Sequence, residues 1–228
     1  MVEPVYDNSV QALKATNEFY ESQEGFQYSE ELAKNWIRNN IKLPKTGKVL
    51  DLCCGDGLWS RGFQLLEPNL QLYGVDISEG GIAKAHKLLS SDEQHFKVCD
   101  AESELPFEDD FFDIIFARGP GLYNQHSMNN DYAIKVLDMW HSKLKPGSGR
   151  FYSIFASTPK MIGSYTPMEK CKLPYNRSPR KSEAVNFSGG KYHHSIETFH
   201  EPFWASNYMK IIDYTFKNNL HILVTTRA

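Results

Sequence analysis

Residues 49–60 have the sequence VLDLCCGDGLWS, an apolar run followed by a turn with two glycines and a second apolar segment. This order predicts a buried strand, a glycine turn and a helix, which is how a parallel α/β sheet holds a nucleotide. Gly55 and Gly57 let the backbone approach a ligand without a Cβ atom in the way, and the first amides of the helix point toward that ligand. The stretch therefore predicts a nucleoside site at the end of a strand that Asp51 closes.

The next predicted strand supports this interpretation. Residues 72–76, LYGVD, end in Asp76, about 20 residues beyond the turn, where an acid accepts hydrogen bonds from ribose hydroxyls. A dinucleotide site also needs a third glycine at a fixed spacing to seat a pyrophosphate, but the glycine that follows Gly57 is Gly62, which is misplaced. The pattern thus predicts a nucleoside pocket but does not match the dinucleotide motif.

Three later segments extend the pattern. They are FKVCDA at 96–101, LPFEDDFFDII at 105–115 and LKPGSGR at 144–150. Together with DLCCGDG at 51–57, they resemble, in the same order, the motifs of the class I S-adenosylmethionine-dependent methyltransferases that act on small molecules. One departure is Cys53, which stands where the family has the first glycine of its motif and narrows the space beside the ligand.

The resemblance implies an α/β fold with a doubly wound, mostly parallel seven-stranded sheet, a C-terminal antiparallel hairpin, and helices on both faces. It also implies S-adenosylmethionine as cofactor and S-adenosylhomocysteine as product. The implied cofactor site comprises Asp51, Cys53, Gly55, Gly57, Asp76, Ile77, Asp100, Ala101, Arg118 and Gly119. Within it, Asp76 would bind the ribose hydroxyls, Asp100 the adenine amino group beside the Ala101 amide, and Asp51 with residues 55–57 the methionine end. Arg118 and Gly119 would form the rim of the site.

Periodicity and capping residues predict the remaining elements. Helices are expected at residues 9–20, from the Ser29 cap to Pro44, from Leu58 to Pro68, from the Ser78 cap to Leu89, at 130–144 and at 196–208. Strands are expected at 95–99, 112–117 and 150–156. The runs 209–216 and 220–225 are joined by a short polar turn and must therefore be antiparallel. The alternation of strands and helices before them predicts a parallel sheet with right-handed crossovers.

The chain is predicted to form one domain over residues 1–228. Its parts are N-terminal helices over the cofactor site (1–44), a cofactor-binding core (45–157), a basic insertion or lid (158–194), and a last helix with the hairpin (195–228). The insertion has seven basic and two acidic residues, a net charge of +5, and the rest of the chain carries −8. Two interpretations stay open: the insertion attracts an anionic acceptor, or it is a solvated loop.

Composition excludes several classes of protein. With 41% apolar and 23% charged residues and a net charge of −3, the sequence is typical of a globular protein and has no global signature of nucleic-acid or membrane binding. No apolar run reaches membrane-spanning length and the first residues do not resemble a signal peptide, so a cytoplasmic location is predicted. The cysteines have no C-x-x-C spacing, and we interpret them as core thiols: Cys53, Cys54, Cys99 and Cys171.

The resemblance implies that the segment after the strand at 112–117 borders the acceptor pocket. Candidate catalytic residues are Tyr123 and His126 in this segment, and His194 if the insertion folds over the same opening. Histidine is suited to proton transfer near neutral pH, although His126 is equally consistent with a surface loop. The segment lacks the [DNS]-P-P-[YFW] motif of DNA amino-methyltransferases and the strand-end Asp of magnesium-dependent enzymes, so we expect neither DNA as acceptor nor a bound metal.

The sequence leaves the acceptor open. We favour a small molecule that receives the methyl group on an oxygen, nitrogen or carbon atom. A protein or RNA acceptor is one alternative, and a cofactor-binding module without catalytic activity is another. A nicotinamide oxidoreductase is least favoured because of the misplaced third glycine. Methyl transfer is an in-line displacement that depends mainly on positioning, so the sequence need not contain a catalytic constellation.

Overall fold

The computed structural model describes residues 17–18, 20–22, 28–92, 95–120, 122, 131–156, 165–167, 181–183, 185–187, 192–194, 209–217 and 220–227. The described helices are α2 (Glu30–Asn40), α3 (Leu58–Leu66), α4 (Glu79–Leu89) and α5 (Asp131–Ser142), and residues 17–18 and 20–22 are also helical. The strands of the main sheet are β1 (Gly47–Leu52), β2 (Leu70–Asp76), β3 (Phe96–Val98), β4 (Ile114–Arg118), β5 (Arg150–Ala156), β10 (Met209–Lys217) and β11 (Leu220–Arg227).

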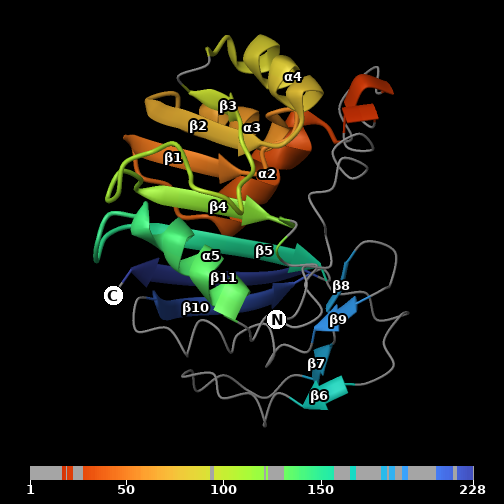
Figure 1. Cartoon of the computed structure of the whole chain (residues 1–228), viewed down its shortest axis with the longest axis vertical. Coiled ribbons are helices and arrows are strands. Elements are labelled where there is room, and N and C mark those ends of the chain that lie inside the picture. Colours follow the sequence, from red (N-terminus) through yellow and green to blue (C-terminus); the bar gives the residue numbers. More distant parts are fainter. Residues whose placement is uncertain are drawn as a thin grey trace.

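The main sheet has seven strands in the order β10-β11-β5-β4-β1-β2-β3 (Figure 1). β1 lies between β2 and β4 and pairs with both in parallel, so that Leu52 is level with Val75 and Ala117. β11 is antiparallel to both β5 and β10. The doubly wound, mostly parallel sheet with a C-terminal antiparallel hairpin is therefore confirmed.

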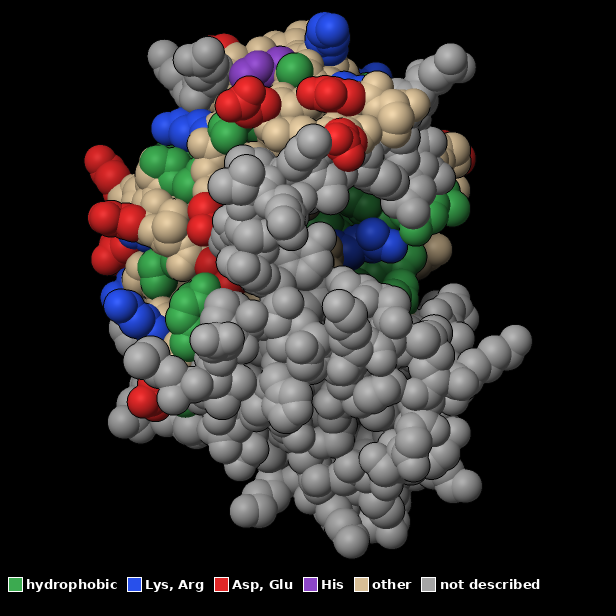
Figure 2. All heavy atoms as spheres, turned by 45° about the vertical axis from the view of Figure 1, so that its right-hand side comes forward, with side chains coloured by type: hydrophobic (Ala, Val, Ile, Leu, Met, Phe, Trp, Pro, Cys, Tyr) green, Lys and Arg blue, Asp and Glu red, His purple; other side chains and the backbone are tan. Residues whose placement is uncertain are grey.

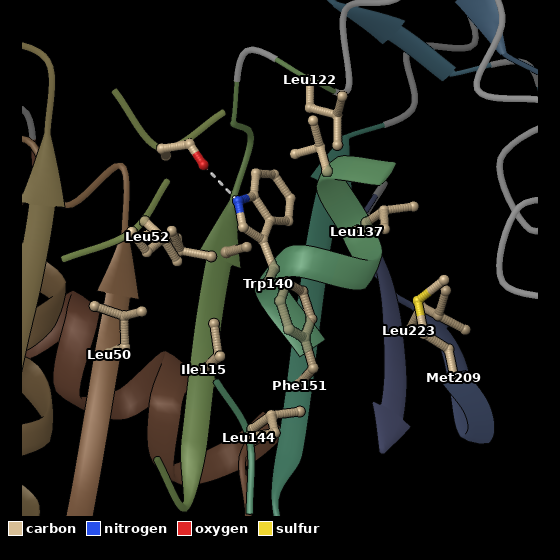
Figure 3. Close-up of a cluster of buried hydrophobic side chains, with 14 of the residues drawn as sticks. Leu50, Leu52, Ile115, Leu122, Leu137, Trp140, Leu144, Phe151, Met209 and Leu223 are labelled. Carbon is tan, nitrogen blue, oxygen red and sulfur yellow. Dashed lines mark hydrogen bonds between the residues drawn. The ribbon is translucent and has the colours of Figure 1, made fainter. Parts of the chain in front are cut away.

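The two faces of the sheet bury two separate hydrophobic clusters. In β4, Ile115 and Ala117 pack on the side of α5, whereas Ile114 and Phe116 pack on the side of α2, α3 and α4. This alternation follows from the period of two along a strand. On the α5 face, Trp140 lies fully buried against Phe151 (Figure 3). Helices thus cover both faces, and the carboxyl ends of the parallel strands remain as the edge at which a ligand can bind.

The predicted capping residues start the helices that they were expected to start. The Ser29 hydroxyl accepts a hydrogen bond from the Leu32 amide at 3.2 Å, and the Ser78 hydroxyl accepts one from the Gly81 amide at 3.0 Å. α2 ends at Asn40, four residues before Pro44, because Ile41 is already extended and its side chain is buried. Local sequence therefore fixes where these helices begin, and core packing fixes where α2 ends.

β4 begins at Ile114, two residues later than expected. Phe112 makes only an isolated bridge to Leu144. The Asp113 carboxylate accepts a hydrogen bond from the Lys48 amide at 2.8 Å and forms an ion pair with the Lys145 ammonium at 2.8 Å. These contacts anchor the entry to the strand, and the strand extends to Arg118 at its carboxyl end.

The described residues of the predicted insertion form four short strands: β6 (Tyr165–Pro167), β7 (Lys181–Glu183), β8 (Val185–Phe187) and β9 (Tyr192–His194). They form two antiparallel pairs, β6 with β7 and β8 with β9, and β8 contacts β5. The predicted helix at 196–208 and most of the one at 9–20 lie outside the described residues. Among the helices that are described, none is long and apolar enough to cross a lipid bilayer.

Candidate cofactor site

The chain leaves β1 through a tight loop in which three residues are left-handed. Their φ angles are 59° at Cys53, 53° at Gly55 and 79° at Gly57. The Cys54 amide donates to the Val75 carbonyl at 3.0 Å, and the Gly57 amide donates to the Cys54 carbonyl at the same distance. The loop is thereby held against the end of β2 and directs the chain into α3.

Close packing explains why two of these positions need glycine. A Cβ atom on Gly55 would overlap the hydroxyl of Tyr20, which approaches from the N-terminal helical segment. A Cβ atom on Gly57 would lie 2.9 Å from the Cβ atom of Ala85 on α4. Both contacts are with the protein itself, so the glycines serve the packing of neighbouring helices, and their predicted approach to a ligand remains a prediction.

Asp76 organises the same loop. One oxygen of its carboxylate accepts the Gly55 amide at 2.8 Å, and the other accepts the Ser78 amide at 2.9 Å. Burial raises the pKa of Asp76, and the hydrogen bonds from Ser78 and Gly55 oppose this effect. Each carboxylate oxygen has two lone pairs, so these bonds leave capacity for ligand hydroxyls. The sequence analysis missed this structural role of Asp76.

Asp51 lies at the end of β1 and is almost fully buried. The Ser60 hydroxyl on α3 donates to its carboxylate at 2.7 Å. The pKa of Asp51 is raised to about 7, mainly by burial and further by the charges of Asp76 and Asp56. The hydrogen bond from Ser60 acts in the opposite direction and lowers this pKa. Three carboxylates around one loop create a negative potential, and this end of the site suits a positively charged group.

Arg118 brings the opposite charge to the end of β4. Its guanidinium carbon lies 4.6 Å from the ring centre of Trp59 and 5.4 Å from that of Tyr28. Its Nε atom is buried and has no hydrogen-bond partner among the described residues. Because Ala117 is level with Leu52, Arg118 follows directly beside the glycine loop. Figure 2 shows Lys or Arg side chains, which it does not label, next to hydrophobic side chains in a hollow of this face of the molecule. This end of the site suits an anionic group.

Beyond Arg118, Gly119 turns the chain away from the sheet. Its φ angle is 63°, and a Cβ atom there would meet no atom of a described residue within 4 Å. The Gly119 amide donates to the Ile154 carbonyl at 2.9 Å, which ties this turn to β5. The rim that the sequence predicts at this position remains a prediction.

The carboxyl end of β3 lies next to that of β2. The Cys99 amide donates to the Asp76 carbonyl at 2.9 Å, and Asp100 follows directly. The Asp100 carboxylate accepts the Glu102 amide at 2.9 Å, while the Ala101 carbonyl accepts the indole N–H of Trp140 at 2.5 Å (Figure 3). Carboxylates thus follow one another along the sheet edge at the ends of β1, β2 and β3.

The structure brings all ten predicted cofactor-site residues to this edge, at the ends of β1 to β4, and Ile77 lies in the bend between β2 and α4. Tyr123 and His126 lie outside the described residues, and His194 belongs to β9, where only the backbone is described. Sequence reasoning missed Ser60 and Trp59; their position in the first turn of α3 was the available signal. In the described ranges, no group of three or more His, Cys, Asp or Glu side chains is arranged to hold a metal ion.

Comparison with known families identifies the segment that builds this edge. Residues 49–147 match the family model described as a methyltransferase domain. The chain is also 33% identical over 123 residues to the demethylmenaquinone methyltransferase of Staphylococcus aureus. That match covers 52% of this chain and 48% of the relative, so the chain spans about half the length of the curated relatives that it matches.

Solved structures with similar folds include a methyltransferase as well as a protein without a stated activity. The S-adenosylmethionine-dependent methyltransferase of Mesorhizobium loti is 17% identical with a TM-score of 0.57, covering 88% of this chain and 100% of that one. The PH0226 protein of Pyrococcus horikoshii is 24% identical with a TM-score of 0.52, covering 100% of this chain and 97% of that one. At these identities the similarity shows the fold alone.

Proposed function

We propose that the chain is a class I S-adenosylmethionine-dependent methyltransferase, because residues 49–147 match the methyltransferase-domain model, and that it transfers the methyl group of this cofactor to a small-molecule acceptor. The observation that carries this proposal is the distribution of charge along the sheet edge. Asp51, Asp76 and Asp100 follow one another at the ends of three strands, and Arg118 ends the fourth. This arrangement complements a nucleoside that carries a cationic sulfonium and an amino-acid tail.

The adenosine half is assigned to the ends of β2 and β3. Asp76 accepts the ribose hydroxyls, with Ile77 beside the sugar, while Asp100 accepts the adenine amino group and the Ala101 amide donates to the ring. Asp76 already accepts two backbone amides, so it positions the glycine loop and the ribose together. An acid that serves both purposes makes loop geometry and nucleoside binding interdependent.

The methionine half is assigned to the ends of β1 and β4. The loop from Cys53 to Gly57 faces the amino group, and Asp51 supplies the negative charge. Arg118, with the Gly119 turn, receives the carboxylate. The buried Nε atom of Arg118 has no partner in the described part of the chain, and a carboxylate would satisfy it. The rings of Tyr28 and Trp59 contact each other, and both lie against the guanidinium, which restricts its motion and lowers the entropy that it loses on binding.

When bound, the cofactor supplies a methyl group on a sulfonium, which leaves as a neutral thioether when an acceptor atom attacks the methyl carbon in line. The chain's task is to hold the acceptor atom about 3 Å from that carbon and to exclude water. Tyr123, His126 and His194 are the candidates for removing a proton from the acceptor. Asp51 stabilises the positive charge of the bound methionine end.

The proposal of a small-molecule acceptor is supported by the demethylmenaquinone methyltransferase relative, whose similarity covers half of the chain. The insertion, with its net charge of +5, favours an anionic acceptor but is also compatible with RNA or an acidic protein. A module that binds the cofactor without turnover is a further alternative. These alternatives share the same cofactor site.

Cofactor binding tests the proposal before any acceptor is known. We expect S-adenosylhomocysteine at micromolar concentration to raise the melting temperature, whereas NAD does not. 5′-Methylthioadenosine, which lacks the amino-acid tail, separates the two halves of the site. Arg118→Gln should weaken S-adenosylhomocysteine about tenfold to a hundredfold and leave methylthioadenosine nearly unchanged, because a charge-assisted hydrogen bond is lost. Arg38→Gln, on the outer side of α2, is the matched control. Stabilisation by NAD alone would refute the proposal.

A further inference from the structure

Two side chains of α5 hold the segment that follows β3. The indole N–H of the buried Trp140 donates a hydrogen bond to the Ala101 carbonyl at 2.5 Å, drawn as a dashed line in Figure 3. The Tyr132 hydroxyl donates to the Glu102 carboxylate at 2.5 Å. Consecutive residues of this segment are therefore attached to α5 by hydrogen bonds from two different turns of the helix.

Glu102 connects this attachment to Asp100. Its backbone amide donates to an oxygen of the Asp100 carboxylate at 2.9 Å, which makes a turn of the Asx type. The orientation of the Asp100 carboxylate thus depends on the position of the Glu102 backbone. That position is in turn fixed by the Tyr132 hydroxyl through the Glu102 side chain.

Simple packing does not require this polar pair. Burial raises the pKa of Glu102 to about 7, and the hydrogen bond from Tyr132 acts in the opposite direction. Both side chains are only partly buried, next to the apolar cluster that contains Ala101 and Trp140. Polar networks of this kind contribute rigidity and a defined geometry more than they contribute stability.

We propose that Glu102 and Tyr132 are positioning residues that make the site specific for the 6-amino group of adenine. The inference rests on the proposed function, in which Asp100 accepts a hydrogen bond from this amino group. A 6-oxo base would place an acceptor against the carboxylate and leave both unpaired. Sites built to hydrogen-bond one group reject analogues that lack it strongly, provided that the protein group cannot turn away. Tyr132 prevents that turn by holding Glu102.

The test compares S-adenosylhomocysteine with S-inosylhomocysteine by isothermal titration calorimetry. In the second ligand an oxo group replaces the 6-amino group and N1 of the base carries a proton, so the change of the binding ratio between variants is what reports on Glu102 and Tyr132. The unsubstituted protein should prefer the adenosyl ligand by at least about a hundredfold. Tyr132→Phe removes one hydroxyl and should reduce this ratio about tenfold, mainly through weaker binding of the adenosyl ligand. Tyr73→Phe is the matched control, because the Tyr73 hydroxyl makes no hydrogen bond with a described residue, and its ratio should not change.

Glu102 provides a second set of variants. Glu102→Gln keeps an oxygen that accepts from Tyr132, so its ratio should stay close to that of the unsubstituted protein. Glu102→Ala should lower the ratio as Tyr132→Phe does, and it serves if Tyr132→Phe does not fold. Equal weakening of both ligands, or an unchanged ratio in both variants, would overturn the inference while the proposed function stands. Absence of S-adenosylhomocysteine binding to the unsubstituted protein would instead contradict the proposed function.

Discussion

The substitution Asp51→Asn should make the protein more stable at alkaline pH and should weaken its binding of the cofactor. Asp51 is 3% exposed, and its carboxylate accepts the Ser60 hydroxyl at 2.7 Å. Asparagine has nearly the same shape and keeps an oxygen for Ser60, but it cannot ionise. Asp51→Asn therefore removes the buried negative charge with little change in packing. Conversely, that charge is what the proposed function requires near the ammonium and sulfonium of the cofactor.

The size of the effect follows from the pKa of Asp51, which burial raises from 3.8 to about 7. The pKa of Asp51 is higher in the folded state than in the unfolded state. The contribution of the protonated Asp51 carboxyl group to stability is therefore complete below about pH 4 and is lost as the pH rises through about 7. A shift of about three units corresponds to at most ~4 kcal/mol. The new amide N–H group costs about 1–3 kcal/mol if it stays unpaired. We expect a net gain of at most about 1–3 kcal/mol for Asp51→Asn at about pH 8.

Urea unfolding without ligand at about pH 5 and about pH 8 measures this difference. Near pH 5 the variant should be no more stable than the unsubstituted protein, because the buried acid is then protonated. Asp113→Asn is the matched control: its carboxylate pairs with Lys145 at 2.8 Å, so the substitution should destabilise the protein at both pH values. If Asp51→Asn were the less stable protein at both pH values by a similar amount, Asp51 would not be a buried charge and the reasoning would be wrong.

Three further substitutions test single features of the fold. Burial lowers the pKa of His141 to about 4. The free energy of unfolding should therefore fall as the pH drops from about 6.5 to about 4. Urea titrations should show a smaller decline for His141→Gln. Cys53→Gly relieves a left-handed non-glycine residue and should raise stability by about 1 kcal/mol in calorimetry, with cofactor binding intact; a loss of stability would contradict this. Gly55→Ala should cost about 1–3 kcal/mol through overlap with Tyr20, and this cost should shrink in a Tyr20→Ala background.

The order of elements could be predicted because local signals and the global fold agree. Ser29 and Ser78 cap the expected helices, and the short turn between β10 and β11 makes them antiparallel. Asp51, Asp76 and Asp100 could be placed at one edge because parallel strands end on the same side of a sheet. These predictions needed only the period of the sequence and the ends of its apolar runs.

The contacts that shape the site could not be predicted, because they join residues far apart in the chain. Tyr132 reaches Glu102 across 30 residues, and no pattern in either segment indicates the partner. The start of β4 was predicted too early because Asp113 is occupied by Lys48 and Lys145, which come from other elements. Similarly, the need for glycine at the loop depends on helices that pack over it. Tertiary packing decides such details.

Transfer of a labelled methyl group tests the central claim most directly. The protein is incubated with methyl-tritiated S-adenosylmethionine and a cell extract, and the products are separated by size. We predict label in the low-mass fraction, and much less with Asp76→Ala, which removes the proposed ribose contact and the anchor of the glycine loop. Label in the protein or RNA fraction would contradict the proposed acceptor class. No transfer at all by a protein that binds S-adenosylhomocysteine would contradict the claim that the chain is an enzyme.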